Sequence, residues 1–214
     1  MGRWTRWLLV GGTLFLLTVG SVACRRTDSL PWREDFSSPE SGWDRYDDDY
    51  GGADYRDGQY VVWVWEEHTT VWGNANRDFD DLDLEVTAWA DAQGEAEVVE
   101  YGVLCRYQDA DHFYYLGVSN DGVAFIRVVD GEDDFLHSLG PEAVQLSPAI
   151  RRGNEPNRLR VVCDGDRLAL YVNGSLVVEG RDDRFRHGDI GLAAGSFAEV
   201  DAIVRFDDLE GRRP

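Results

Sequence analysis

Hydrophobic and polar positions alternate along most of the chain, which is the period of a β-strand. In 81–90 (DLDLEVTAWA), apolar residues occupy every second position from Leu82 to Ala88, and polar residues occupy most of the positions between them. Similar alternation appears in 157–172 and in 98–107, where it predicts that Tyr101, Val103, Cys105 and Tyr107 share one face. No segment repeats its apolar residues every 3.6 positions over several turns, so the pattern predicts strands and not amphipathic helices.

Turn residues separate these segments about every ten positions, the spacing typical of antiparallel sandwiches and barrels. The stretch 157–174 (NRLRVVCDGDRLALYVNG) predicts two strands joined by a tight turn at 164–166, followed by a second turn at Asn173-Gly174. Such a hairpin needs other strands to cover its apolar face. We expect a helical turn only in 146–156, which is rich in Pro and Arg. The pattern predicts an all-β fold.

Length and composition fit one such domain. The chain has 214 residues, of which 43% are hydrophobic, enough for a sizeable core. Its net charge of −20 argues against nucleic acid as a partner, because phosphates need a basic face. The same charge opposes flat binding of the folded surface to anionic lipids.

The N-terminus has the pattern of an export signal. Arg3 and Arg6 precede an apolar run at 8–19, which ends in the small residues of 20–23. The run is shorter than the roughly 20 residues of a spanning helix, so it indicates a cleaved signal peptide.

The end of this segment, Ser21-Val22-Ala23-Cys24, resembles the lipobox of bacterial lipoproteins, with Ser21 where Leu is usual. The resemblance implies acylation of Cys24, whereas ordinary cleavage after Ala23 would leave Cys24 unlipidated. We expect a signal peptide at 1–23, a tether at 24–31, a folded domain at 32–210 and a tail at 211–214. The protein is then exported and held by lipid at the outer face of the cytoplasmic membrane or on the cell surface.

Cysteine usage agrees with export. With Cys24 lipidated, Cys105 and Cys163 remain as an even pair, both in strand-like runs on apolar positions. An oxidising compartment favours a Cys105–Cys163 disulfide. The alternative is two buried free thiols.

Several segments together resemble the concanavalin A-like lectin/glucanase superfamily of jelly rolls, closest to the laminin-G-like and 3-keto-disaccharide hydrolase-like domains of exported bacterial lipoproteins. The resemblance covers nearly all of the chain after 31 and implies an antiparallel jelly-roll sandwich. It rests on Asp35-Phe36, Gly42-Trp43, 55–60 (YRDGQY), 105–122 (CRYQDADHFYYLGVSNDG), 157–174, 188–195 and Phe206-Asp207-Asp208.

One strand is a candidate for catalysis. Asp81, Asp83 and Glu85 lie close to the Glu-x-Asp-x-Glu pattern of laminarinase- and lichenase-type glycosidases in that superfamily. Period-two spacing puts the three carboxylates on one face, as a nucleophile and general acid would require. Asp81 stands where the nucleophilic Glu is expected, and a shorter side chain displaces the attacking oxygen. The alternative is the solvated outer face of an ordinary strand.

Aromatic residues are candidates for carbohydrate binding, because sugar rings stack on Trp and Tyr while polar neighbours bind their hydroxyls. Trp63 and Trp65 share a face with Val61, so we expect at least one of them in the core. For Arg106 and Tyr114 we expect exposure. The candidate residues are Trp63, Trp65, Trp72, Trp89 and Tyr114, with Arg106, Asp109 and Asp111 as hydrogen-bonding groups.

Related jelly rolls often bind one structural calcium where the first and last strands meet. The matching positions here are Asp35 and Asp207, with Asp47–Asp49 a looser alternative, although runs of Asp usually mark solvated turns.

The sequence is most consistent with a lipid-anchored, non-catalytic recognition or adhesion module for carbohydrate. A glycoside hydrolase-like enzyme and a structural or protein-binding domain are the alternatives.

Overall fold

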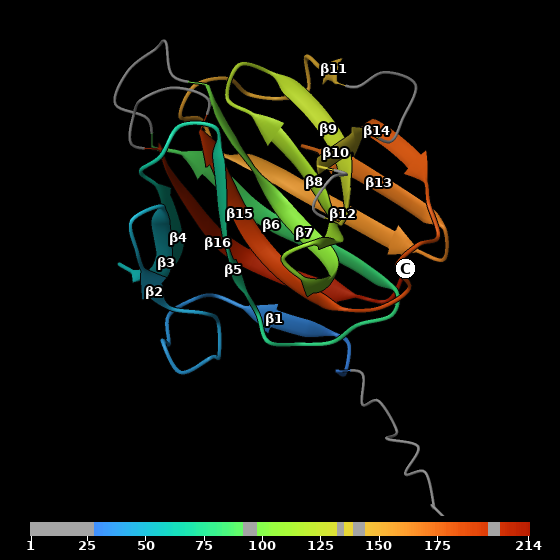
Figure 1. Ribbon diagram of the computed structural model, residues 1–214, viewed down its shortest axis with the longest axis horizontal. Helices are drawn as coiled ribbons and strands as arrows, with labels where there is room; N and C mark the ends of the chain where they lie inside the picture. The colour runs from blue at the N-terminus through green and yellow to red at the C-terminus, as the bar shows by residue number, and fades with distance from the viewer. Residues whose placement is uncertain (1–27, 92–97, 132–134, 139–143, 197–201) are drawn as a thin grey trace, which may run out of the picture.

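The structure, a computed structural model, describes residues 28–91, 98–131, 135–138, 144–196 and 202–214. Its described residues form two antiparallel sheets, packed face to face (Figure 1). β7, β8, β9 and β15 lie over β6, β12, β13 and β16 in this view. All regular elements described are strands, and no helix among these residues could cross a membrane.

The nine-stranded sheet has the order β14-β13-β12-β6-β16-β4-β3-β2, and β1 also pairs with β16. Its strands are β1 (Trp32–Glu34), β2 (Tyr46–Asp47), β3 (Gly51–Arg56), β4 (Gln59–Val64), β6 (Leu82–Ala90), β12 (Asn157–Asp164), β13 (Arg167–Val172), β14 (Ser175–Arg181) and β16 (Ala202–Arg212).

The seven-stranded sheet has the order β10-β9-β8-β7-β15-β5, and β11 also pairs with β9. Its strands are β5 (Thr69–Asn74), β7 (Val99–Asp109), β8 (His112–Ser119), β9 (Val123–Asp130), β10 (Phe135–Ser138), β11 (Gln145–Leu146) and β15 (Asp189–Ser196).

The main core lies between the sheets and comes from the alternation in the sequence. Leu84 and Val86 of β6 are fully buried in it, and so are Val103 of β7 and Leu116 of β8. Burying each such aliphatic side chain stabilises the fold by about 1.5–3 kcal/mol before the entropy of ordering is subtracted.

The hairpin of 157–172 forms as the sequence predicts, with β12 pairing β13 from Leu159 to Asp164. At the next turn, Asn173 and Gly174 both have positive φ, at 50° and 85°. Two-residue hairpin turns of type I′ need positive φ at both central residues, and Asn and Gly adopt positive φ readily.

A disulfide joins Cys105 of β7 to Cys163 of β12. Both half-cystines are buried in the core, so the bond links the two sheets through their packed faces. The sequence-based pairing is confirmed, and the alternative of two free thiols is wrong.

Two local expectations are wrong. In 146–156, Leu146 ends β11 and the rest is irregular with two short turns and no helical turn, and the Ser147 carbonyl accepts a hydrogen bond from Ile150 N–H at 3.3 Å. Tyr107 does not share the core face of Tyr101 and Cys105, because a bulge shifts the register of β7 after Cys105. Arg106 has a φ of 54° at this bulge, and the extra residue turns Tyr107 to the outer face of the sheet.

Candidate functional site

The outer face of the seven-stranded sheet carries a second apolar cluster, separate from the main core. Trp72 and Tyr107 are half-buried at the margin of this cluster, with ring centroids 6.0 Å apart. Phe113 contacts both rings, at 5.5 Å from Trp72 and 5.8 Å from Tyr107. The buried members of the cluster are Leu104, Phe113, Tyr115, Phe125, Val129 and Ala193.

Four aromatic side chains surround a hollow of about 370 Å³ beside β5, the edge strand of this sheet. We call Tyr46, Tyr50, Trp72 and Tyr107 the β5 surface. Tyr46 and Tyr50 are 37% and 61% exposed, which is unusual for large hydrophobic residues in this chain. The Tyr46 hydroxyl donates a hydrogen bond to the Trp72 carbonyl at 2.7 Å and so attaches the β2 segment to β5.

Polar groups lie around the same hollow. The Asp44 carboxylate accepts hydrogen bonds from the Asn74 backbone N–H at 3.1 Å and from Asn76 Nδ2 at 2.9 Å. Asp48 Oδ1 accepts from the backbone N–H groups of Tyr50 and Gly51, at 2.9 and 3.1 Å. These contacts fix both carboxylates in position. The hollow's polar lining is Asp44, Asp48, Thr69, Thr70 and Asn74.

The potential in this region is negative. Burial raises the pKa of Tyr46 to about 12, and the charges of Asp48 and Asp44 contribute to this rise. Burial also raises the pKa of Asp189 to about 6, even though three backbone N–H groups donate to its carboxylate. Asp44 adds to that rise as a neighbouring negative charge.

A second hollow of about 450 Å³ also has Tyr107 in its lining. Asn76 links the two hollows, since its side chain donates to Asp44 and its backbone N–H donates to Asp189. Tyr107 is therefore a wall shared by two adjoining hollows. The remaining lining of the second is Asp28, Asn76, Arg77, Asp78, Gln108, Gly188 and Asp189.

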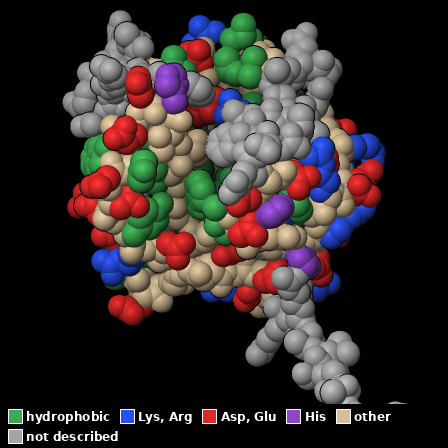
Figure 2. Space-filling view, viewed as in Figure 1, with side chains coloured by type: hydrophobic (Ala, Val, Ile, Leu, Met, Phe, Trp, Pro, Cys, Tyr) green, Lys and Arg blue, Asp and Glu red, His purple; other side chains and the backbone are tan. Residues whose placement is uncertain are grey.

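The face that Figure 2 shows carries groups of hydrophobic side chains with acidic side chains between them. Most of the basic side chains visible in this view lie toward its rim.

Of the Trp residues proposed from sequence, the structure brings only Trp72 to the β5 surface. Trp63 is 2% exposed on the outer face of β4, where the Arg56 guanidinium lies 3.8 Å from its ring and Asp47 accepts from its Nε1. Trp65 is 40% exposed just beyond β4. Trp89 is half-buried on the outer face of β6, opposite Arg205.

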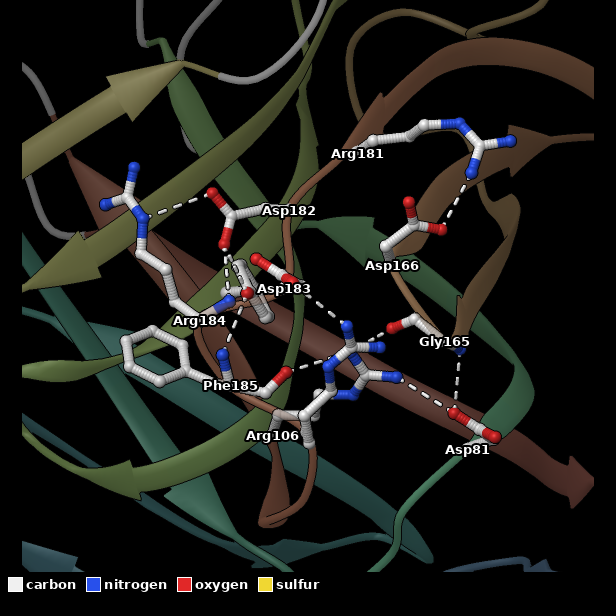
Figure 3. A network of polar contacts seen from close by, with 11 residues as sticks. Asp81, Arg106, Gly165, Asp166, Arg181, Asp182, Asp183, Arg184 and Phe185 are labelled. Atoms are coloured by element: carbon white, nitrogen blue, oxygen red, sulfur yellow. Dashed lines mark hydrogen bonds and ion pairs between the residues drawn. The ribbon is translucent and has the colours of Figure 1, made fainter.

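The expected exposure of Arg106 and Tyr114 is wrong. The Arg106 guanidinium is buried and donates to the carbonyls of Gly165 and Phe185 at 2.8 and 2.9 Å, and to Asp81 at 3.0 Å (Figure 3). The Tyr114 hydroxyl donates to Asp182 at 2.6 Å. Burial raises the pKa of this hydroxyl and lowers that of Arg106. Both side chains hold loops together and do not face a ligand.

Of the proposed hydrogen-bonding residues, Asp109 ends β7 and Asp111 lies in the turn that follows, and both are exposed. Asp109 accepts from the backbone N–H of Asp111 at 3.0 Å and is 2.6 Å from His112 Nδ1. Neither residue lines the two hollows beside Tyr107.

The three carboxylates proposed for catalysis all lie at the nine-stranded sheet and pair with arginines. Asp81 binds Arg106, and Glu85 binds Arg158 at 2.9 Å. Asp83 is 3% exposed and accepts two hydrogen bonds from Arg160, at 2.8 and 2.7 Å. Arg212 also lies 3.2 Å from Asp83. Asp83 and Glu85 share the outer face of β6 as predicted, but that face carries a network of ion pairs. Asp81 lies before β6 and pairs with Arg106 of the other sheet.

The positions proposed for calcium lie near the paired first and last strands. Asp35 follows β1 and accepts from Ser37, and this contact lowers its pKa. Asp207 lies in β16 and accepts from the backbone N–H of Asp208. Among the described residues, no group of three His, Cys, Asp or Glu side chains is arranged to hold a metal ion.

The β5 surface includes residues that the sequence reasoning missed. Tyr46 and Tyr50 flank the acidic run 47–49, which favours a solvated turn when it is considered alone. A pair of aromatic residues around a turn is the signal that could have identified them. Tyr107 was assigned to the wrong face because the bulge at Arg106 has no sequence signature.

No family model matches the chain, and no curated protein matches it. Solved structures do match. The carbohydrate-binding module CBM66 from Bacillus subtilis aligns with a TM-score of 0.55 at 17% identity, over 80% of this chain and 96% of the module. A protein of unknown function with a galectin-like fold, also from Bacillus subtilis, has a TM-score of 0.61 at 12% identity, over 85% and 94%.

The carbohydrate recognition domain of Emp47p aligns with a TM-score of 0.57 at 15% identity, over 85% of this chain and 94% of that domain. A native glycosidic hydrolase aligns with a TM-score of 0.61 at 11% identity, over 89% and 100%. The fold is therefore a galectin-like jelly roll, as the sequence resemblance implied.

Proposed function

We propose that the protein is a non-catalytic carbohydrate-recognition module and that its ligand binds at the β5 surface. The observation that carries the proposal is the grouping of Tyr46, Tyr50, Trp72 and Tyr107 around a hollow with carboxylate, amide and hydroxyl groups in its lining. Pyranose rings present apolar C–H faces to aromatic rings and equatorial hydroxyls to polar groups at the edges. The β5 surface offers both kinds of contact within one hollow.

The adjoining hollow that shares Tyr107 favours an extended ligand over a monosaccharide. A ligand that stacks a sugar ring on Tyr107 would have room for neighbouring sugar units in the two hollows that share this residue. Two of the structural neighbours are named as a carbohydrate-binding module and a carbohydrate recognition domain, which agrees with this proposal.

The contacts of the acidic strand argue against the glycosidase alternative. A retaining or inverting mechanism needs one carboxyl group that donates a proton and another that attacks or activates water. Asp83 is buried beneath two arginines, and Glu85 pairs with Arg158 and Arg212. Guanidinium partners favour the ionised carboxylate and oppose a proton-donating role.

We also propose that the module is exported and anchored through lipid on Cys24, with the residues before Asp28 as its tether, because Asp28 is already bonded to Asp78 of the folded domain. The support is the sequence of the first 24 residues, which lie outside the described part of the chain. Expression in a bacterial host with labelled fatty acid tests it. Label should enter the wild type and be absent from Cys24→Ser, and equal labelling of both would reject the anchor.

A broad glycan array, followed by affinity electrophoresis on the best polysaccharide, tests the binding function. We expect retardation of the wild type and its loss in Tyr107→Ala, because Tyr107 borders both hollows. Trp89→Ala is the matched control, since it removes a half-buried aromatic ring from the opposite sheet. Absence of retardation on every glycan, or equal loss in Trp89→Ala, would reject the site.

A further inference from the structure

The lining of the two hollows beside Tyr107 has a strong excess of negative charge. Among the described residues that line them, five are carboxylates and one is a guanidinium. The carboxylates are Asp28, Asp44, Asp48, Asp78 and Asp189, and the guanidinium is Arg77.

The nearest arginines already have partners within the protein. Arg77 lies 3.6 Å from Asp28 and stacks on Trp32, with its guanidinium carbon 4.7 Å from the ring centroid. Arg45, next to Asp44 in sequence, binds Asp54 at 2.6 Å. Each of these two positive charges is therefore already balanced by a carboxylate of the protein.

Aromatic rings add to this field. The face of a Trp or Tyr ring is the negative end of its quadrupole and attracts an ammonium group within about 6 Å of the ring centroid. In the first hollow, Tyr46, Tyr50, Trp72 and Tyr107 line the same space as Asp44 and Asp48. This combination favours a cation that carries an apolar body.

From this arrangement we infer that the ligand is a glycan with protonated amino groups, such as a chain of de-N-acetylated amino sugars, and that uronic or sulfated glycans are excluded. The inference rests on the proposed function, because it names the ligand class of the same site. The sugar ring stacks on the aromatic face, while the ammonium group lies toward the carboxylates of Asp44 and Asp48. Acetylation of the amine removes the charge and this part of the interaction.

Isothermal titration of the purified protein with three oligosaccharides of equal length tests the inference. The probes are a glucosamine hexamer, its fully N-acetylated counterpart and a galacturonate hexamer, at a pH where the amines are protonated. We expect the glucosamine hexamer to bind about three- to tenfold tighter than the acetylated one at low salt, with the difference shrinking as salt is added. The galacturonate hexamer should not bind.

Asp48→Asn provides the specific variant. The side-chain oxygen of Asn can still accept from the Tyr50 and Gly51 backbone, so the turn is retained while the charge is lost. We expect this variant to lose the preference for the amine, so that the glucosamine hexamer and the acetylated hexamer bind it with equal affinity. Asp183→Asn is the control, because it removes one negative charge from an exposed residue that does not line either hollow.

The possible results distinguish a failure of the charge inference from a failure of the proposed carbohydrate binding. Equal affinity for the amino and acetylated hexamers in the wild type, or equal effects of Asp48→Asn and Asp183→Asn, would overturn the inference and leave carbohydrate binding intact. Binding of the galacturonate hexamer would overturn the inference that the site excludes anionic glycans. Failure of every hexamer and every arrayed glycan to bind would instead reject the proposed function.

Discussion

Removing the disulfide should destabilise the protein strongly, because this bond links the two sheets within the core. Cys105 and Cys163 are separated by 58 residues, and that segment includes β8, β9 and most of β12. The perturbation is the double variant Cys105→Ala/Cys163→Ala, which leaves Cys24 in place.

The magnitude follows from the length of the closed loop. In the chain-entropy treatment, crosslinking a 58-residue segment restricts the unfolded chain by about 4 kcal/mol. For a domain of this size, 1 kcal/mol corresponds to about 2–4 °C in Tm, so the expected drop is roughly 10–15 °C.

Thermal unfolding followed by circular dichroism, with and without dithiothreitol, measures this effect. The reductant should lower the Tm of the wild type toward that of the double variant and leave the double variant unchanged. A Tm of the double variant within about 2 °C of the wild-type Tm would refute the reasoning, since the disulfide would then add little to the stability of the fold.

Three further predictions concern the polar network and titration. Arg106→Met should lower the free energy of unfolding, measured in urea, by about 3–5 kcal/mol, because it leaves buried carbonyls without donors. The exposed control Arg181→Met should lower it by no more than about 1 kcal/mol. Similar losses in the two variants would contradict the structural role of Arg106. Asp83→Asn should lower the free energy of unfolding by about 2–3 kcal/mol, and the exposed control Glu179→Gln by at most about 1 kcal/mol. A large rise in the Tm of Asp83→Asn would instead indicate that the Asp83 carboxylate is kept for function. The Asp189 carboxyl should titrate near 6 by NMR, above its unfolded value, so the folded state gains up to about 3 kcal/mol as the pH falls from about 6 to about 4. A midpoint near 4 would contradict the burial of this carboxyl.

The fold was largely predictable because its strands follow local rules. The alternation of 81–90 places Leu84 and Val86 inside and Asp83 and Glu85 outside, as expected. The disulfide was predictable from the number of cysteines and their apolar positions, without knowledge of which strands are neighbours.

The site was less predictable because its residues meet only in the tertiary structure. Tyr46 comes from one sheet and Trp72 from the edge of the other, and their contact depends on how the sheet edges approach each other. A single extra residue at the Arg106 bulge reverses the facing of Tyr107, and a shift of one position always moves a side chain to the opposite face.

Burial of polar groups also depended on the tertiary structure. Arg106 looked like an exposed hydrogen-bonding residue, yet its guanidinium reaches the turn at Gly165 and the loop at Phe185, 59 and 79 residues away in sequence. Local pattern cannot show that such distant carbonyls converge on one side chain.

Indole NMR during titration with the glycan that the array selects is the most direct test of the β5 surface. The Trp72 Nε1–H signal should shift saturably, because its ring borders the hollow, while the Trp89 signal on the opposite sheet stays in place. A saturable shift of Trp89 with Trp72 unmoved would contradict the assignment of the binding site.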